Sequence, residues 1–469
     1  MSRTWPCWTV RWRRCCGGEY VFQDGAAVKF RMSALVERLR SSLFFVPMIA
    51  VFVAAVLGFV SLAVDRNIWS KMADLPIGFT STVESARTLL GVIAGATISF
   101  AGIAFSISLL IIQLASSQYS PRVVHTLFRD PFNKRVMALV VGTFTYCVVV
   151  LRSVRSAFDP GGEPVIPNLS VTVAVVLGIA TILATVALIN HSAHAMDVSE
   201  ILQRIRREAT EQIRAEWTPA DPNTDLPLLP DTARTASSTV IRVDRSGWVQ
   251  QIDTDALLAC VPDGVTLTVE TYAGRFAIEG TRFCSMSPSI SDEDRHAVER
   301  ALLAAVSIGG TRTMQQDVSF GLRQLVDVAV KALSPGINDP TTAQDAIFHT
   351  AAVLSELLRH DPPAPVRTKG NRTLVMAEQP THDELIHLAF DETRRAGAGH
   401  PTVCEYLLVS IAPLVESLEA VSLGERTRGL RRQARLVVDG CGATNLLDDD
   451  IDMVRQTYRD RFARLVDGS

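Results

Sequence analysis

The sequence has few charged and few aromatic residues, and it lacks the short motifs that mark familiar catalytic and cofactor sites. Of its 469 residues, 20% are Asp, Glu, Lys or Arg and 7% are aromatic. It contains no G-x-x-x-x-G-K-[ST] phosphate loop, no H-E-x-x-H zinc helix, no G-x-S-x-G nucleophile turn and no C-x-x-C pair. We therefore expect no catalytic residue, no cofactor and no resident metal, and the sequence favours a role other than enzymatic catalysis.

The composition also excludes several broad classes of protein. Eight scattered cysteines in a chain of this length do not form the framework of a small disulfide-stapled module. A hydrophobic content of 48% excludes a disordered chain. Residues 1–196 carry 17 Lys and Arg against 9 Asp and Glu, whereas residues 197–469 carry 29 against 40. We expect no nucleic-acid partner for this acidic half, because phosphate binding needs clustered Lys and Arg.

The basic half contains four long apolar runs, at 43–64, 89–115, 136–151 and 169–189. A helix needs roughly 20 residues to cross the ~30 Å hydrocarbon core of a bilayer. The runs therefore predict a four-helix transmembrane domain over 32–196. No ionisable residue lies at the middle of a run, which argues against proton-coupled transport.

Basic residues beside the runs predict their orientation. Three groups of Lys and Arg lie before the first run, between the second and third runs, and after the fourth run, which places all three on one side of the membrane. The groups are Arg31, Arg38 and Arg40; Arg122, Arg129, Lys134 and Arg135; and Arg204, Arg206 and Arg207. Loops enriched in Lys and Arg remain in the cytoplasm. We therefore expect a multi-pass protein of the cell membrane, with both termini and the acidic domain in the cytoplasm.

Small residues form a stripe along the second run. The stripe consists of Gly91, Gly95, Ser99, Gly102 and Ser106 at helical spacing, and Gln113 extends it. Small residues allow helix backbones to approach closely in lipid, so the stripe is typical of a tight helix–helix contact. A second interpretation is the polar lining of a pore in a homo-oligomer.

Two smaller features lie near the ends of the basic half. Residues 1–31 hold three of the six Trp, and Met32 opens a plausible basic lead, so we predict that 1–31 is a non-native or disordered extension. His191 and His194 share one face at the end of the fourth run. A role at the helix end is the simplest interpretation, and a metal or pH-sensing site is the alternative.

The acidic half predicts a cytoplasmic α+β domain. A charged helix and a Pro-rich linker occupy 197–238, and a small β-rich subdomain follows at 239–290. There we expect two pairs of short strands, 240–243 with 247–249 and 265–269 with 275–278, separated by a helix at 254–260. The remainder, 291–469, is predicted to be helical, beginning with helices over 292–307 and 315–333.

The most distinctive segment joins two of these helices, with the sequence Ser-Pro-Gly-Ile-Asn-Asp-Pro-Thr-Thr-Ala at 334–343. Pro335-Gly336 predicts a type II turn with positive φ at Gly336, and Asp339 predicts the cap of the next helix. Arg323, Asp327 and Lys331 recur every four residues before it. This ladder is either a solvated charge pattern or, with Asn338, Asp339, Thr341 and Thr342, part of a ligand pocket.

Two passages together resemble a bacterial family of predicted membrane proteins known only as a domain of unknown function. The first is Gln-Leu-Ala-Ser-Ser-Gln-Tyr-Ser-Pro-Arg at 113–122 with Asp130 after it, and the second is Gly321 through Asp327 together with 332–343. The resemblance covers most of 35–440. It implies the four-span topology and supplies no activity, cofactor or catalytic residue.

These observations lead to two functional expectations. The first is an integral plasma-membrane protein embedded in the lipid bilayer as a homo-oligomer, which acts as a channel or a membrane-coupled sensor. The second is a membrane-anchored enzyme or ligand-binding regulator with a site near 323–342 and a ligand of unknown identity. The uncharged spans and the small-residue stripe favour the first expectation.

Overall fold

The computed structural model describes residues 45–68, 82–118, 131–154, 167–194, 197–221, 238–290, 292–377 and 379–462. The chain divides into two compact units. We call the part within 28–200 the helical unit and the part within 201–469 the mixed unit. Residues 1–31 and 119–130, on which two of the predictions above depend, lie outside the described residues.

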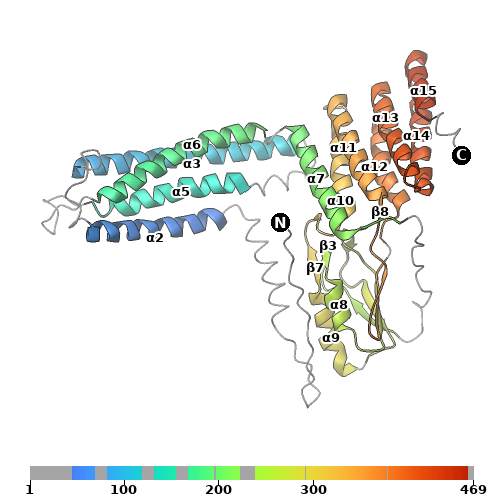
Figure 1. Ribbon diagram of the computed structural model, residues 1–469, viewed down its shortest axis with the longest axis horizontal. Coiled ribbons are helices and arrows are strands. Elements are labelled where there is room, and N and C mark those ends of the chain that lie inside the picture. Colours follow the sequence, from blue (N-terminus) through green and yellow to red (C-terminus); the bar gives the residue numbers. More distant parts are fainter. Residues whose placement is uncertain are drawn as a thin grey trace. The chain divides into compact units, whose positions relative to one another are not determined.

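Four long helices build the described part of the helical unit: α2 (Phe45–Ile68), α3 (Val83–Gln118), α5 (Pro131–Leu151) and α6 (Asn168–His194). Each contains nearly all of one predicted apolar run. In Figure 1, α5 lies between its neighbours, and it packs against α2, α3 and α6. Ala54, Leu90, Tyr146 and Ala174 belong to the core that the four helices share.

Hydroxyl and carboxylate groups link the ends of these helices inside the unit. The Tyr146 hydroxyl lies 3.0 Å from Ser61 Oγ and 3.1 Å from the Ser170 carbonyl oxygen, to both of which it donates. The Asp65 carboxylate accepts hydrogen bonds from the backbone N–H groups of Leu169 at 3.1 Å and Ser170 at 3.0 Å. Asp65 therefore satisfies N–H groups in the first turn of α6 that have no partner within the helix.

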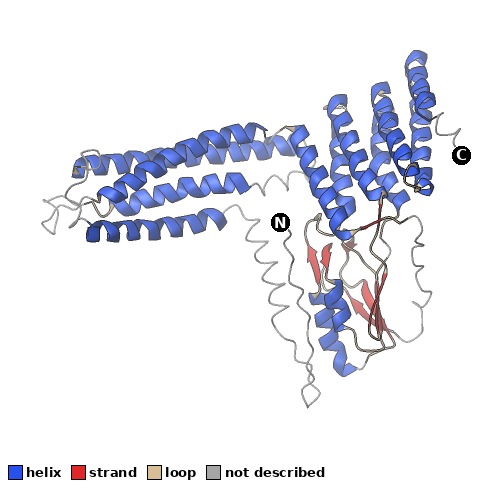
Figure 2. Cartoon of the chain, viewed as in Figure 1, coloured by secondary structure: helices blue, strands red, loops and turns tan. Residues whose placement is uncertain are grey.

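Five helices among the described residues are long and apolar enough to cross a membrane. Four of the candidate spans belong to the helical unit, and the fifth is Pro401–Glu419 in the mixed unit. The chain is thus mostly helical, with several apolar helices of membrane-spanning length and a separate region that contains strands (Figure 2).

The mixed unit contains an α-helical layer. In chain order its helices are α7 (Val198–Glu216), α10 (Val318–Ala332), α11 (Pro340–Leu358), α12 (His382–Gly397), α13 (Pro401–Glu419), α14 (Thr427–Gly442) and α15 (Asp448–Phe462). The helices α11, α13 and α15 lie side by side in Figure 1, and each packs on the next. The Ala209 methyl group of α7 lies close to the backbone of α10 at Gly321. A Cβ added to Gly321 would lie only 2.5 Å from that methyl carbon. A glycine is therefore needed for this close contact between α7 and α10.

The strands form one five-stranded sheet, one three-stranded sheet and a short two-stranded ladder. The five-stranded sheet has the order β2 (Thr239–Arg242), β6 (Arg282–Ser287), β4 (Thr266–Val269), β10 (Arg372–Val375) and β9 (Val366–Lys369). The three-stranded sheet has the order β5 (Phe276–Ala277), β3 (Gly247–Ile252) and β7 (Val306–Gly309). The ladder pairs β1 (Thr218–Pro219) with β8 (His360–Asp361).

Both predicted strand pairings are wrong. β2 pairs with β6 and β3 pairs with β5 and β7, while β4 takes β6 and β10 as its neighbours. β10 lies about a hundred residues further along the chain and pairs with β4 in parallel. Short strands carry little information about partners so distant in the sequence.

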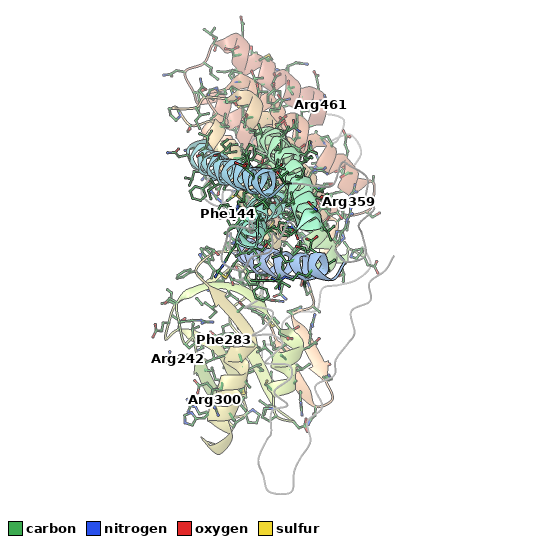
Figure 3. All side chains as sticks on the ribbon, turned by 90° about the vertical axis from the view of Figure 1, so that its left-hand side faces the viewer. Phe144, Arg242, Phe283, Arg300, Arg359 and Arg461 are labelled. Carbon is green, nitrogen blue, oxygen red and sulfur yellow. The ribbon has the colours of Figure 1, made fainter. Side chains whose placement is uncertain are left out.

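Two helices, α8 (Thr254–Cys260) and α9 (Asp292–Ala304), accompany the strands. The predicted helix at 254–260 is confirmed, with Asp253 accepting a hydrogen bond from Ala256 N. The helix predicted over 292–307 ends earlier, because Val306 and Ser307 join β7 opposite β3. Phe283, labelled in Figure 3, is 2% exposed within the apolar core of this region, whereas Arg242 and Arg300 are exposed.

Candidate functional site

The small-residue stripe lies on the exposed face of α3. Gly91, Gly95, Ser99, Gly102 and Ser106 are all exposed, and so is Gln113. A Cβ added at any of the three glycines would have no heavy atom within 4 Å. The opposite face of α3 is the packed one, where Ala86, Leu90 and Ala104 are 0% exposed. Within the described part of the chain, the stripe therefore forms no helix–helix contact.

Arg323 on α10 is held by carboxylates from two helices. Its guanidinium lies 2.6 Å from Asp327 Oδ1 on the same helix and donates to both carboxylate oxygens of Glu392 on α12, at 2.5 and 2.7 Å. The hydrogen bonds to Glu392 and the nearby Asp327 raise the pKa of Arg323. Arg323 therefore links α10 to α12, and a ligand at this point would have to compete with two carboxylates.

The Ser-Pro-Gly-Ile-Asn-Asp segment connects α10 to α11 through a compact turn. The backbone N–H groups of Ile337 and Asn338 both donate to the Ser334 carbonyl oxygen, at 3.0 and 2.9 Å. The residue with positive φ is Asn338, at +49°, and not Gly336. The predicted type II turn is therefore wrong. The chain completes its change of direction two residues later, at Asn338, because asparagine tolerates the left-handed region better than most residues.

Asp339 caps α11 as predicted. Its carboxylate accepts hydrogen bonds from Thr342 N at 3.0 Å and from Thr342 Oγ1 at 2.6 Å, and Pro340 occupies the first turn. These bonds lower the pKa of Asp339. Thr341 is exposed beside the cap. The structure brings Asp339 together with Thr342 and brings Arg323 together with Asp327, and each set is satisfied by its own partners.

One of the two histidines at the end of α6, His191, packs against an aromatic ring. The His191 ring is half-buried and packs against Phe132, with 4.7 Å between ring centroids. His194 belongs to α6, but its side chain is not among those described. No group of three or more His, Cys, Asp or Glu suited to a metal ion occurs among the residues that were described.

The mixed unit contains a pocket of about 390 Å³ that the sequence did not predict. Its wall comes from the end of α7, from β3 and α8, and from the segments before β9 and α12. Most of its lining is apolar and includes Trp217, Tyr272 and Met376. The charged side chains among its described lining residues are Glu216 and Arg367.

These two charged groups differ in their surroundings. Burial raises the pKa of Glu216, and the Arg367 guanidinium acts in the opposite direction. The only hydrogen bond described for the Glu216 carboxylate comes from Gln212 Nε2, at 3.3 Å. Arg367 is exposed, and its Nη1 donates to Thr254 Oγ1 at 2.8 Å and lies 3.9 Å from the solvated Asp255 carboxylate. The pocket thus offers a desolvated acid and a more solvated cation to one ligand.

Ion pairing fixes the proline-rich side of this pocket. Pro362, Pro363 and Pro365 line it directly after β8. Asp361 precedes them, and its carboxylate accepts a hydrogen bond from Arg426 Nη2 at 2.6 Å. Arg426 also donates to the Leu358 carbonyl oxygen at 2.9 Å. Because proline has little backbone freedom, an anchored proline run makes a preformed wall.

Comparison with known proteins places this architecture in a family. A model for "Predicted membrane protein (DUF2254)" matches residues 40–412. The chain is 30% identical over 397 residues to the uncharacterized protein Rv1290c of Mycobacterium tuberculosis. The aligned region covers 82% of this chain and 74% of the relative. The uncharacterized protein Mb1321c of Mycobacterium bovis matches with the same identity and coverage. No solved structure matches the chain.

Proposed function

The chain belongs to the DUF2254 family of predicted membrane proteins, and on this premise we propose that it spans the membrane four times as a homo-oligomeric channel or membrane-coupled sensor. The exposed small-residue face of α3 carries the proposal. An uncharged run of helix that turns its glycines and serines outward gains close packing only when another chain covers them. In a ring of such chains the same face lies at or beside the central axis.

The fifth apolar helix, α13, is better explained as a core helix of a water-soluble domain. It packs against α11, α12, α14 and α15. Its Leu407 and Leu408 are 0% exposed, whereas Phe52 on α2 and Leu183 on α6 are 72% and 65% exposed. The neighbour α14 presents Arg428, Arg432 and Arg435 outward. Three exposed arginines along one face suit water and not hydrocarbon.

The distribution of basic residues supports a cytoplasmic position for both termini and for the mixed unit. Arg206 and Arg207 lie on α7, the helix that follows α6 in the chain, and both are exposed. Basic residues within about 15–20 residues of a span end bias that end toward the cytoplasm. Tagging either terminus with a reporter that is active only in the cytoplasm would test the orientation, and an inactive reporter at either end would contradict it.

Cross-linking tests the assembly at single-residue resolution. We expect Ser99→Cys to form disulfide-linked dimers in native membranes treated with a mild oxidant. Ile98→Cys is the matched control, because Ile98 is 55% exposed at the same depth but lies about 100° around the helix. Equal dimer yields from the two variants, or none from Ser99→Cys, would exclude α3 as the contact.

Ion flux separates a channel from a sensor. Liposomes that contain the purified protein should release a trapped ion. Gly95→Leu should reduce this flux, because the leucine side chain occupies the space beside the small residues of the stripe. Mass measurement in detergent gives the number of chains. A strictly monomeric protein without flux would contradict the channel, whereas an oligomer without flux would favour the sensor.

The second candidate is a ligand-binding regulator or enzyme that uses the 323–342 segment. It is favoured by Asn338, an exposed residue other than glycine whose backbone φ is positive. Such backbone conformations occur preferentially at functional sites. Asn338→Gly retains the turn, since glycine tolerates the left-handed region. A variant that folds but fails to complement a deletion strain supports a site here, and full complementation supports a purely structural turn.

A further inference from the structure

We infer that the pocket beside Glu216 and Arg367 binds a zwitterionic molecule with an apolar body, of the size of an apolar α-amino acid or dipeptide. The inference concerns the mixed unit alone, and it holds whether or not the protein forms a channel. It depends on the pocket's volume, on its apolar lining and on the two opposite charges in its wall.

The volume and lining define the body of the ligand. About 390 Å³ lies at the lower end of the range for small-molecule pockets. The Trp217 side chain is 4% exposed and is held edge-on to the His382 ring, with 6.0 Å between centroids. Tyr272 and Met376 line the pocket together with the prolines. These apolar surfaces favour an aliphatic or aromatic group over a sugar or a phosphate.

The charges define the ends of the ligand. Glu216 is half-buried, and a desolvated carboxylate is stabilised by a cation brought against it. An ammonium group supplies that charge and can also contact the face of an aromatic ring. Arg367 lies nearer to solvent, and its planar guanidinium favours a carboxylate. A ligand with one ammonium and one carboxylate complements both charges, whereas a simple anion complements that of Arg367 only.

The pocket's supports indicate that it exists before the ligand arrives. Gln316, in the pocket wall, accepts a hydrogen bond from Ile252 N at 2.8 Å and donates to the Ile252 carbonyl oxygen at 3.2 Å. It therefore fixes the end of β3. Arg426 and Asp361 fix the proline side. A ligand then orders little of the protein when it binds, which favours affinity for a small molecule.

Calorimetry on the full chain in detergent tests the inference with two probes, L-phenylalanine and the dipeptide leucyl-phenylalanine. At least one should bind saturably. Acetylating its amine, or converting its carboxylate to an amide, should weaken binding about tenfold or more, because each change removes one charge-assisted contact. Saturable binding of neither probe would overturn the inference, and so would equal binding of the charged and blocked forms.

Variants assign each charge to its end. Glu216→Gln should weaken binding of the free probe about tenfold and leave binding of the N-acetylated probe unchanged. Arg367→Gln should abolish the preference for the probe with a free carboxylate over the probe with an amide. Glu211→Gln and Arg245→Gln are matched controls, because both residues are exposed and lie outside the pocket lining. Unchanged affinity in both pocket variants, with unfolding midpoints like those of the controls, would place any binding elsewhere. Flux measured on the same variants keeps this result separate from the channel proposal.

Discussion

The helical unit exposes many of its large apolar side chains, whereas the mixed unit buries most of its own. Met48, Phe52 and Leu183 are 67%, 72% and 65% exposed on α2 and α6, while Thr143 and Thr181 lie buried between helices and share a hydrogen bond of 3.0 Å. In the mixed unit, Leu354 and Leu407 are 0% exposed.

The proposed topology explains this difference by the solvent around each unit. Water expels apolar groups, so a soluble unit gathers them inside. Hydrocarbon provides no such force between helices and no partner for hydroxyl groups, so a membrane unit turns apolar groups outward and satisfies hydroxyls between its helices. The same kind of substitution should therefore change membrane insertion or stability by different amounts in the two units.

The largest difference is expected from one substitution made at two exposed leucines. Leu183→Asp on α6 places a carboxylate in hydrocarbon, at a cost of about 3 kcal/mol in membrane insertion. Leu447→Asp, at a position 73% exposed in the mixed unit, should change the free energy of unfolding by no more than about 0.5 kcal/mol. The membrane-inserted fraction and the unfolding midpoint of each variant check the pair. Similar effects at both positions would mean that α6 does not face lipid.

Arg323→Met should have the next largest effect, a loss of about 2 kcal/mol of stability in the mixed unit. It removes the guanidinium from Asp327, whose side chain is 8% exposed, so the effect lies below that of a fully buried pair. Arg204→Met is the control, because Arg204 and Glu208 form the same i,i+4 pair with side chains about one-third exposed. Its loss should be about 0.5 kcal/mol. Chemical unfolding measures both, and equal losses would refute the importance of burial.

Asp339→Ala should cost about 1 kcal/mol by removing the cap of α11. The pKa of Asp339 is lowered in the folded protein by its hydrogen bonds to Thr342. Its charge therefore contributes stability above the ordinary Asp value of about 4, and this contribution is lost as the pH falls through the folded value. Asp339→Asn can still cap the helix but should lack this pH dependence. If the stability of Asp339→Asn and of the unsubstituted protein changed with pH in the same way, Asp339 would not be the source of this pH dependence.

Tyr146→Phe should have the smallest effect, about 0.6 kcal/mol, the average for a hydrogen bond between membrane helices. The hydroxyl removed is the one that donates to Ser61 and Ser170. Tyr406→Phe, where a half-buried ring packs edge-on to Phe348 in the mixed unit, is the matched control and should be neutral. Thermal unfolding in detergent compares them. A loss well above 2 kcal/mol would mean that the buried hydroxyl cluster dominates the stability of the helical unit.

The apolar runs could be located from the sequence because membrane insertion depends on a local property. The run predicted at 169–189 lies within α6, and the one at 136–151 lies within α5. The cap at Asp339 was likewise predictable, because its partner Thr342 is three residues away. In each case the deciding residues are neighbours in the chain, so their physics needs no tertiary contact.

The parts that the sequence could not predict depend on distant partners. β4 pairs with β10, Arg323 meets Glu392 and Asp65 caps a helix that begins at Asn168. The pocket joins Glu216 to Arg367 across some 150 residues of chain, and neither residue belongs to a motif. A tryptophan at the end of a charged helix and a proline run were the signals present, and each alone has an ordinary structural explanation.

The sequence by itself determined the division of the molecule into an apolar basic part and a polar acidic part, together with the helices that fill the first. Hydrophobic length and charge are additive along a chain, so they can be summed without a fold. Only the tertiary structure decided which face of α3 stays open, which strands pair and where two opposite charges share a pocket. Those outcomes depend on which surfaces meet, and that choice is made by packing the whole unit at once.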